Sequence, residues 1–164
     1  MDLVVNQSGQ AVWGDRPMRC AIGRAGASAN KTEGDGATPL GRFAMRCLFY
    51  RADRLARPKT ALHSRPIAQE EGWCDAPGDP QYNRLVHLPY PASTENLWRE
   101  DGVYDLIVPL GYNDAPIVPG KGSAIFLHLA TPDFTPTAGC VALAREDLLA
   151  VLETADASSC VVVA

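Results

Sequence analysis

Prolines and glycines occur along the whole length of this chain, and they constrain its fold more than any other feature. The 164 residues include thirteen prolines and fourteen glycines. Proline removes a helical hydrogen bond and glycine destabilises helix interiors, so this density excludes a helical bundle and favours short strands joined by turns. Because a chain of this length fits one core, we expect residues 1–164 to form a single, mainly β domain.

Apolar runs bounded by turn residues indicate where the strands lie. Alternating or continuous Val, Ile, Leu, Phe and Tyr residues are typical of half-buried and fully buried strands. The sequence predicts a hairpin over 3–13 and further strands over 18–22, 42–50, 104–110, 123–130 and 159–163.

Three other segments complete the expected organisation. Residues 23–41 are rich in glycine and predict a long loop, and residues 51–100 are irregular and rich in proline, which is typical of a lid or insertion. Residues 145–155 predict one helix, because Leu148 and Leu152 repeat at helical spacing behind an acidic first turn.

Charge and hydropathy limit the partners and the location of the protein. A net charge of −4 argues against nucleic acid or an anionic membrane as a partner, since both bind basic surfaces. No apolar run reaches the roughly 18 residues of a membrane span. The first basic residue is Arg16 and no apolar leader segment follows it, so we expect a cytoplasmic protein, or a periplasmic one if a leader was removed.

The five cysteines are an odd number and form no Cys-x-x-Cys pair. Free thiols of this kind are typical of a reducing compartment and not of a disulfide framework. The histidines and cysteines also lack the paired spacing of zinc ligands, and no nucleotide-binding loop is complete. We therefore expect no metal and no cofactor.

A histidine and a cysteine near the C-terminus are the strongest candidates for catalysis. His128 lies on a predicted strand, and Cys140 follows twelve residues later in a Gly139-Cys140 turn before the predicted helix. A neighbouring imidazole can convert a thiol to the nucleophilic thiolate, and glycine permits unusual dihedrals and close backbone approach. We expect Cys140 to react with iodoacetamide faster than the other four thiols. The alternative is a small buried cysteine beside a structural histidine.

Two motifs resemble one known family. Residues 137–141 (Thr-Ala-Gly-Cys-Val), preceded by His128, resemble the active-site signature of the L,D-transpeptidase (YkuD-type) catalytic domain, which ends in Ser/Thr-His-Gly-Cys. Upstream, Thr38-Pro39-Leu40-Gly41 followed by Phe43 is similar to the Thr-Pro-x-Gly-x-Phe element of that family. The resemblance implies a YkuD-like β-sandwich with one or two short helices, one of them after the cysteine turn.

The resemblance also implies roles for individual residues. Cys140 would attack the L,D peptide bond between meso-diaminopimelate and D-alanine in peptidoglycan stem peptides, and His128 would transfer the protons. Backbone N–H groups of Gly139 and Cys140 would form the oxyanion hole. Thr137 or its main chain would orient the imidazole.

The chain departs from the family pattern at positions that contact substrate. Ala138 replaces the second histidine, Ala142 replaces a frequent arginine, and the loop from 128 to 140 is shorter than usual. We therefore expect these departures to affect substrate and acceptor preference, and not the nucleophile. Side chains that could bind the substrate, or could instead be surface and packing residues, are Arg145, Lys121, Arg24, Arg99, Tyr112 and Trp98.

Three functions are consistent with the sequence. The first is a cytoplasmic L,D-carboxypeptidase that trims D-alanine from muropeptides during peptidoglycan recycling. The second is an exported L,D-transpeptidase that cross-links or remodels the cell wall. The third is a non-catalytic domain that binds peptidoglycan fragments. The partners in every case are stem peptides or muropeptides, and the oligomeric state stays open.

Overall fold

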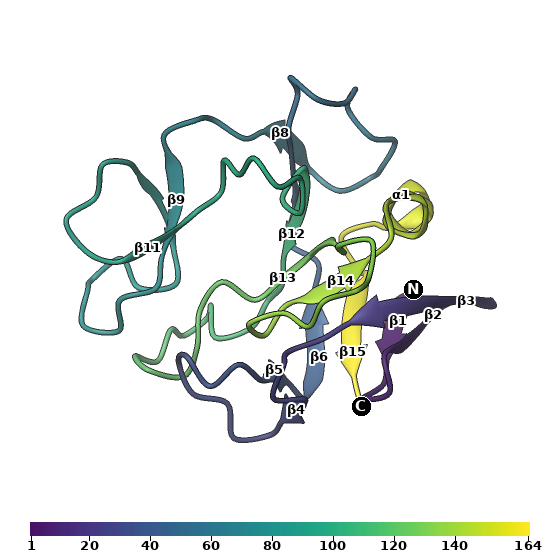
Figure 1. Ribbon diagram of the computed structural model, residues 1–164, viewed down its shortest axis with the longest axis horizontal. Helices are drawn as coiled ribbons and strands as arrows, with labels where there is room; N and C mark the ends of the chain where they lie inside the picture. Colours follow the sequence, from purple (N-terminus) through teal and green to yellow (C-terminus); the bar gives the residue numbers. More distant parts are fainter.

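A computed structural model describes all 164 residues, and most of its regular structure is β-strand (Figure 1). This confirms the mainly β fold class. The elements in chain order are β1 (Asp2–Val5), β2 (Gln10–Trp13), β3 (Arg16–Ala21), β4 (Ala27–Ser28), β5 (Thr38–Pro39), β6 (Gly41–Ala44), β7 (Leu48–Tyr50), β8 (Ser64–Pro66), β9 (Glu71–Cys74), β10 (Leu85–His87), β11 (Thr94–Asn96), β12 (Leu106–Pro109), β13 (Phe126–Leu129), β14 (Val141–Leu143), α1 (Arg145–Thr154) and β15 (Cys160–Val163).

One long, curled sheet forms the centre of the molecule. Its ten strands run in the order β6-β15-β1-β2-β3-β14-β13-β12-β7-β8. The curl brings the half around β1 and β15 against the half around β13 and β14, and the apolar core lies between them. Leu3, Val161, Leu127 and Val141 are each fully buried in that core. Two packed sheet halves of this kind make a β-sandwich, as the sequence predicts.

Alternation along β13 separates the core from a second face of the sheet. Successive side chains of a strand point to opposite faces, so Leu127 and Leu129 enter the main core while Phe126 and His128 face the other side. A smaller apolar cluster covers this other face and includes Phe126 and Cys140. The two candidate catalytic residues therefore lie on the face that the main core leaves free.

Residues 51–100 cover part of that second face. Their strands β9, β10 and β11 form a separate three-stranded sheet, which lies apart from the curled sheet in Figure 1. Trp73 of this small sheet packs edge-on against Phe126, with the ring centroids 5.2 Å apart. The segment has more regular structure than the sequence predicts, and it supplies a wall beside β13. Its movement as a lid stays a prediction.

The strand predicted over 42–50 is two strands in the structure. β6 pairs with β15 and β7 pairs with β12, near opposite ends of the curled sheet. A single straight strand cannot reach both partners, so the chain bends over residues 45–47 to pass from one half of the sandwich to the other. No proline or glycine lies between residues 42 and 50, so the sequence does not mark this bend.

The helix lies where the sequence predicts it, with Leu148, Val151 and Leu152 buried against the core. It does not follow the cysteine turn directly, because β14 lies between Cys140 and the first helical residue, Arg145. The N-terminus of the helix is thus separated from the turn. With ten residues, this helix is too short to cross a lipid bilayer.

Candidate active site

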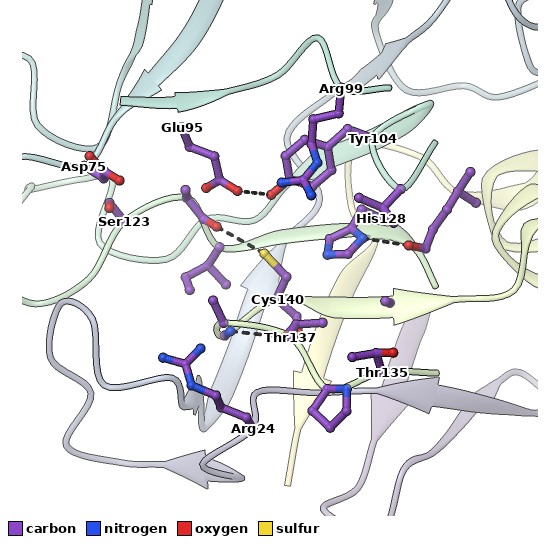
Figure 2. A pocket seen from close by; sticks show the side chains of 18 of the residues that line it. Arg24, Asp75, Glu95, Arg99, Tyr104, Ser123, His128, Thr135, Thr137 and Cys140 are labelled. Atoms are coloured by element: carbon purple, nitrogen blue, oxygen red, sulfur yellow. Dashed lines mark hydrogen bonds between the residues drawn. The ribbon is translucent and has the colours of Figure 1, made fainter. Parts of the chain in front are cut away.

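The candidate catalytic residues come from two neighbouring parallel strands. β13 pairs with β14, and His128 lies opposite Ala142, so the residue before β14, Cys140, faces the same side as His128. Both side chains line one cleft of about 530 Å³. Figure 2 shows them next to each other, with Glu95 and Tyr104 on one side and Arg24 on the other. The structure therefore brings together the pair that the sequence predicts.

The turn before Cys140 needs a glycine. Gly139 has a φ of 143°, which few residues with a side chain adopt. A Cβ atom on Gly139 would also lie 2.9 Å from the carbonyl oxygen of Ala37. Glycine therefore permits a close approach of this turn to the loop preceding β5.

Thr137 fixes this turn and does not orient the imidazole. Its Oγ1 accepts a hydrogen bond from the Gly139 N–H at 3.1 Å and donates one to the Cys140 carbonyl at 2.7 Å. The oxygen that holds His128 belongs to Leu129, 2.9 Å from Nδ1. Because a carbonyl only accepts, Nδ1 carries the proton and Nε2 is left as the basic nitrogen.

One of the two backbone groups expected in the oxyanion hole is already engaged. The Gly139 N–H donates to Thr137, as described above, whereas the Cys140 N–H donates to no protein group. The turn therefore offers the Cys140 N–H to a developing oxyanion, where one preorganised donor contributes substantially to catalysis.

A comparison with known protein families identifies the family of this chain. A family model for the YkuD L,D-transpeptidase catalytic domain matches residues 2–163. The chain belongs to this family. Its members are cysteine-dependent enzymes that act on peptidoglycan stem peptides. Searches of curated proteins and of solved structures found no match.

The thiol of Cys140, the candidate nucleophile, is neutral at rest. Burial, followed by the negative charge of Glu95, raises the pKa of the Cys140 thiol to about 12. Its Sγ donates to the carbonyl of Ala124 at 3.2 Å and accepts from the N–H of Phe126 at 3.3 Å, and it is not hydrogen-bonded to His128. A raised pKa argues against the expectation that Cys140 reacts fastest with iodoacetamide, since the thiolate is the reactive form.

His128 is likewise neutral at rest. Burial lowers the pKa of its imidazole to about 4, although the hydrogen bond to Leu129 opposes this shift. The ring packs edge-on against Tyr104, with centroids 5.1 Å apart. A neutral imidazole with a free Nε2 is the form that can accept a proton from a thiol.

Two residues that the sequence analysis did not select lie beside the thiol. The Tyr104 hydroxyl donates to the carboxylate of Glu95, which comes from β11, and the same hydroxyl interacts with Cys140. Burial raises the pKa of Glu95. An isolated glutamate in a segment predicted as irregular carries no signal that would place it at a site on β13.

Only two of the six candidate substrate-binding residues line the cleft. Arg24 projects from the loop before β4 and forms no ion pair with a carboxylate, while Arg99 pairs with Asp101. The unpaired guanidinium of Arg24 suits a carboxylate of the substrate, whereas the charge of Arg99 is already balanced by Asp101.

The other four candidates have structural contacts outside the cleft. Arg145 is paired with Asp105 at 3.0 Å, so it cannot replace the arginine that the family often carries at position 142. Tyr112 donates its hydroxyl proton to the carbonyl of Lys121, and Lys121 lies away from the cleft. The Trp98 ring is covered by an arginine side chain.

The cleft contains further charged and polar side chains that the sequence did not indicate. They include Lys31, Glu33, Asp75 and Ser123. No group of three or more His, Cys, Asp or Glu side chains is arranged to hold a metal ion.

Replacing Glu95 by Gln should make Cys140 more reactive. The substitution keeps a partner for Tyr104 and removes the charge that opposes thiolate formation, so alkylation by iodoacetamide at pH 8 should become about three- to tenfold faster, because the rate follows the thiolate fraction. Peptide mass spectrometry over a time course measures this rate at Cys140. The exposed Glu70→Gln variant is the matched control, and equal rates in wild type and Glu95→Gln would contradict the role of Glu95.

Proposed function

We propose that this protein is an L,D-carboxypeptidase that removes the terminal D-alanine from the tetrapeptide stems of soluble muropeptides. The observation that carries the proposal is a cysteine and a neutral histidine on the floor of a cleft of about 530 Å³. This volume suits a short peptide. Arg24, which lines the same cleft and has no acidic partner, supplies positive charge for the free carboxylate that such a substrate presents.

A cytoplasmic role in peptidoglycan recycling is part of the proposal. The five cysteines are all free, and four of them are buried. Unpaired thiols persist in reducing compartments. A domain of this family in the cytoplasm would meet released muropeptides and not the intact wall, so trimming of fragments is the activity expected there.

The geometry suggests how acylation proceeds from two neutral groups. Cys140 Sγ attacks the carbonyl carbon of the L,D bond while its proton passes to Nε2 of His128, and the carbonyl π electrons move to the oxygen. The Cys140 N–H donates to that oxyanion. Collapse restores the carbonyl and expels D-alanine, whose amine takes the proton from His128. Water, deprotonated by the same imidazole, then attacks the thioester carbonyl. The C–S bond breaks, and the departing Cys140 sulfur takes the proton from His128, which restores the neutral pair.

Transpeptidation is the second candidate, and it is favoured by the description of the matching family model. The acyl-enzyme is the same in both reactions. Attack by a second stem peptide's amine in place of water would cross-link two stems. The acceptor that reaches the thioester therefore decides between the hydrolase and the transferase.

A non-catalytic binding domain is the third candidate. It is favoured by the buried thiol, whose pKa of about 12 and hydrogen bond to Ala124 resemble those of a structural cysteine. In that case the cleft would bind muropeptides without converting them.

Incubation with a disaccharide-tetrapeptide separates the three candidates. We expect release of D-alanine and accumulation of the tripeptide form, even when a second stem peptide is present as an amine acceptor. Mass spectrometry of the products measures both outcomes. Cys140→Ala should abolish turnover without loss of fold, because it removes only Sγ.

Cross-linked dimers would instead assign the transferase. Turnover that persists in Cys140→Ala would contradict the role of the thiol. If the wild type binds the muropeptide without converting it, the protein is the non-catalytic binding domain. Cys20→Ala is the matched control, since Cys20 is a buried thiol outside the cleft whose pKa burial raises to about 11.

The pH dependence should reflect the lowered pKa of His128. The imidazole must be neutral to accept the thiol proton, so kcat/KM should fall only as the pH drops through about 4, and not near the ordinary histidine value of about 6.5. Initial rates from pH 3.5 to 8 measure this decrease in kcat/KM on the acidic side of the pH profile. Circular dichroism at each pH verifies that the protein is folded. An acid limb centred near pH 6.5 would show that the imidazole is solvated or ion-paired in the free enzyme.

A further inference from the structure

A lysine ammonium lies buried in the wall of the catalytic cleft. Lys31 belongs to the loop between β4 and β5, its residue is only 5% exposed, and it lines the same cleft as Gly139 and Cys140. Lysine is rarely buried to this degree unless its charge is paired. Its burial beside a nucleophile therefore requires a structural or a chemical explanation.

The position of this ammonium is fixed by its neighbours. Nζ donates to Asp35 at 2.6 Å and to the carbonyl of Thr32 at 3.2 Å. Asp35 is held in turn by the N–H groups of Thr32 and Ala37, at 2.8 Å and 2.9 Å. The aliphatic stem of Lys31 lies against Gly122, where an added Cβ would be 3.1 Å from Cε. An ammonium has three protons, and two of them are used here.

The same ammonium lies beside the turn that carries the nucleophile. Nζ is 3.6 Å from the position that a Cβ on Gly139 would occupy, and Gly139 has no side chain to separate the two. The charge of Lys31 also lowers the pKa of Cys140, against the larger effects of burial and of Glu95. Lys31 is therefore electrostatically coupled to the reacting sulfur.

The turn at Cys140 offers only one free backbone donor to an oxyanion. Gly139 donates its N–H to Thr137, which leaves the Cys140 N–H as the free donor of the turn. We propose that Lys31 supplies the second donor, with the remaining Nζ proton, and is a further catalytic residue. This inference rests on the proposed acyl transfer at Cys140.

In the acylation step, Sγ bonds to the carbonyl carbon and its proton passes to His128. The carbonyl π pair becomes the oxyanion, which accepts hydrogen bonds from the Cys140 N–H and the Lys31 ammonium. The ammonium keeps its proton throughout. When the oxyanion collapses, the carbonyl re-forms and the leaving group departs with the electron pair of its broken bond.

A comparison of two reagents tests this role without relying on a peptidoglycan substrate. p-Nitrophenyl acetate acylates a thiol through an oxyanion, whereas iodoacetamide alkylates it by displacement and forms none. In Lys31→Met, acylation of Cys140 should slow by about a hundredfold, the usual effect of removing one oxyanion donor. Alkylation at the same pH should slow by less than about fivefold, because only the thiolate fraction changes.

Two further variants keep the test decisive. Lys59→Met is the matched control, since Lys59 is an exposed lysine paired with Glu153, and both of its rates should equal those of wild type. Lys31→Gln retains only a weaker, neutral donor, so its acylation should be slower than that of wild type and faster than that of Lys31→Met. It takes the place of Lys31→Met if that variant does not fold.

Three results would each overturn the role of Lys31. The first is equal slowing of acylation and alkylation, and the second is unchanged acylation in Lys31→Met or Lys31→Gln. The third is a wild-type Cys140 thiol that the ester does not acylate. Normal ester acylation without turnover of the disaccharide-tetrapeptide would contradict the proposed function and leave the role of Lys31 intact.

Discussion

The parallel pairing of β13 with β14 is the constraint on which the candidate site depends. Its register places His128 opposite Ala142 and brings the preceding Cys140 to the same face of the sheet. A shift by one residue would turn one of the two side chains into the apolar core, because strand side chains alternate between faces. The register is secured by Leu127, Val141 and Leu143, which are fully buried on the core side. The core of the sandwich thus determines the geometry of the site.

The electrostatics of the cleft follow from the same arrangement. The second face of the sheet is covered by residues 51–100, so Cys140 and His128 lose most of their contact with water and both remain neutral at rest. A neutral pair avoids the cost of burying two charges. In the proposed mechanism, proton transfer accompanies attack on the substrate, and donors around the turn stabilise the charge that develops on the carbonyl oxygen. The surroundings of Cys140 are therefore part of the proposed mechanism, together with His128.

Much of this could be predicted from the sequence, and the exceptions have physical causes. The density of Pro and Gly and the apolar alternation predicted the β fold. The Gly139-Cys140 turn pointed to the candidate pair that the structure brings together in one cleft. The hydrogen bond from His128 to Leu129 could not be predicted, because every residue has a carbonyl and none is marked in the sequence. Arg145 was a poor candidate because its partner, Asp105, lies forty residues away along the chain. Lys31 was missed for a similar reason, since the path of its loop depends on tertiary contacts.

The most direct test of the account is to look for the covalent intermediate. Acid quenching during turnover of a disaccharide-tetrapeptide, followed by intact-protein and peptide mass spectrometry, should show a thioester of the disaccharide-tripeptide on the peptide that contains Cys140. The adduct should disappear in Cys140→Ala. Turnover that proceeds with no adduct at any quench time, or with the adduct on another residue, would contradict the assignment of Cys140 as the nucleophile.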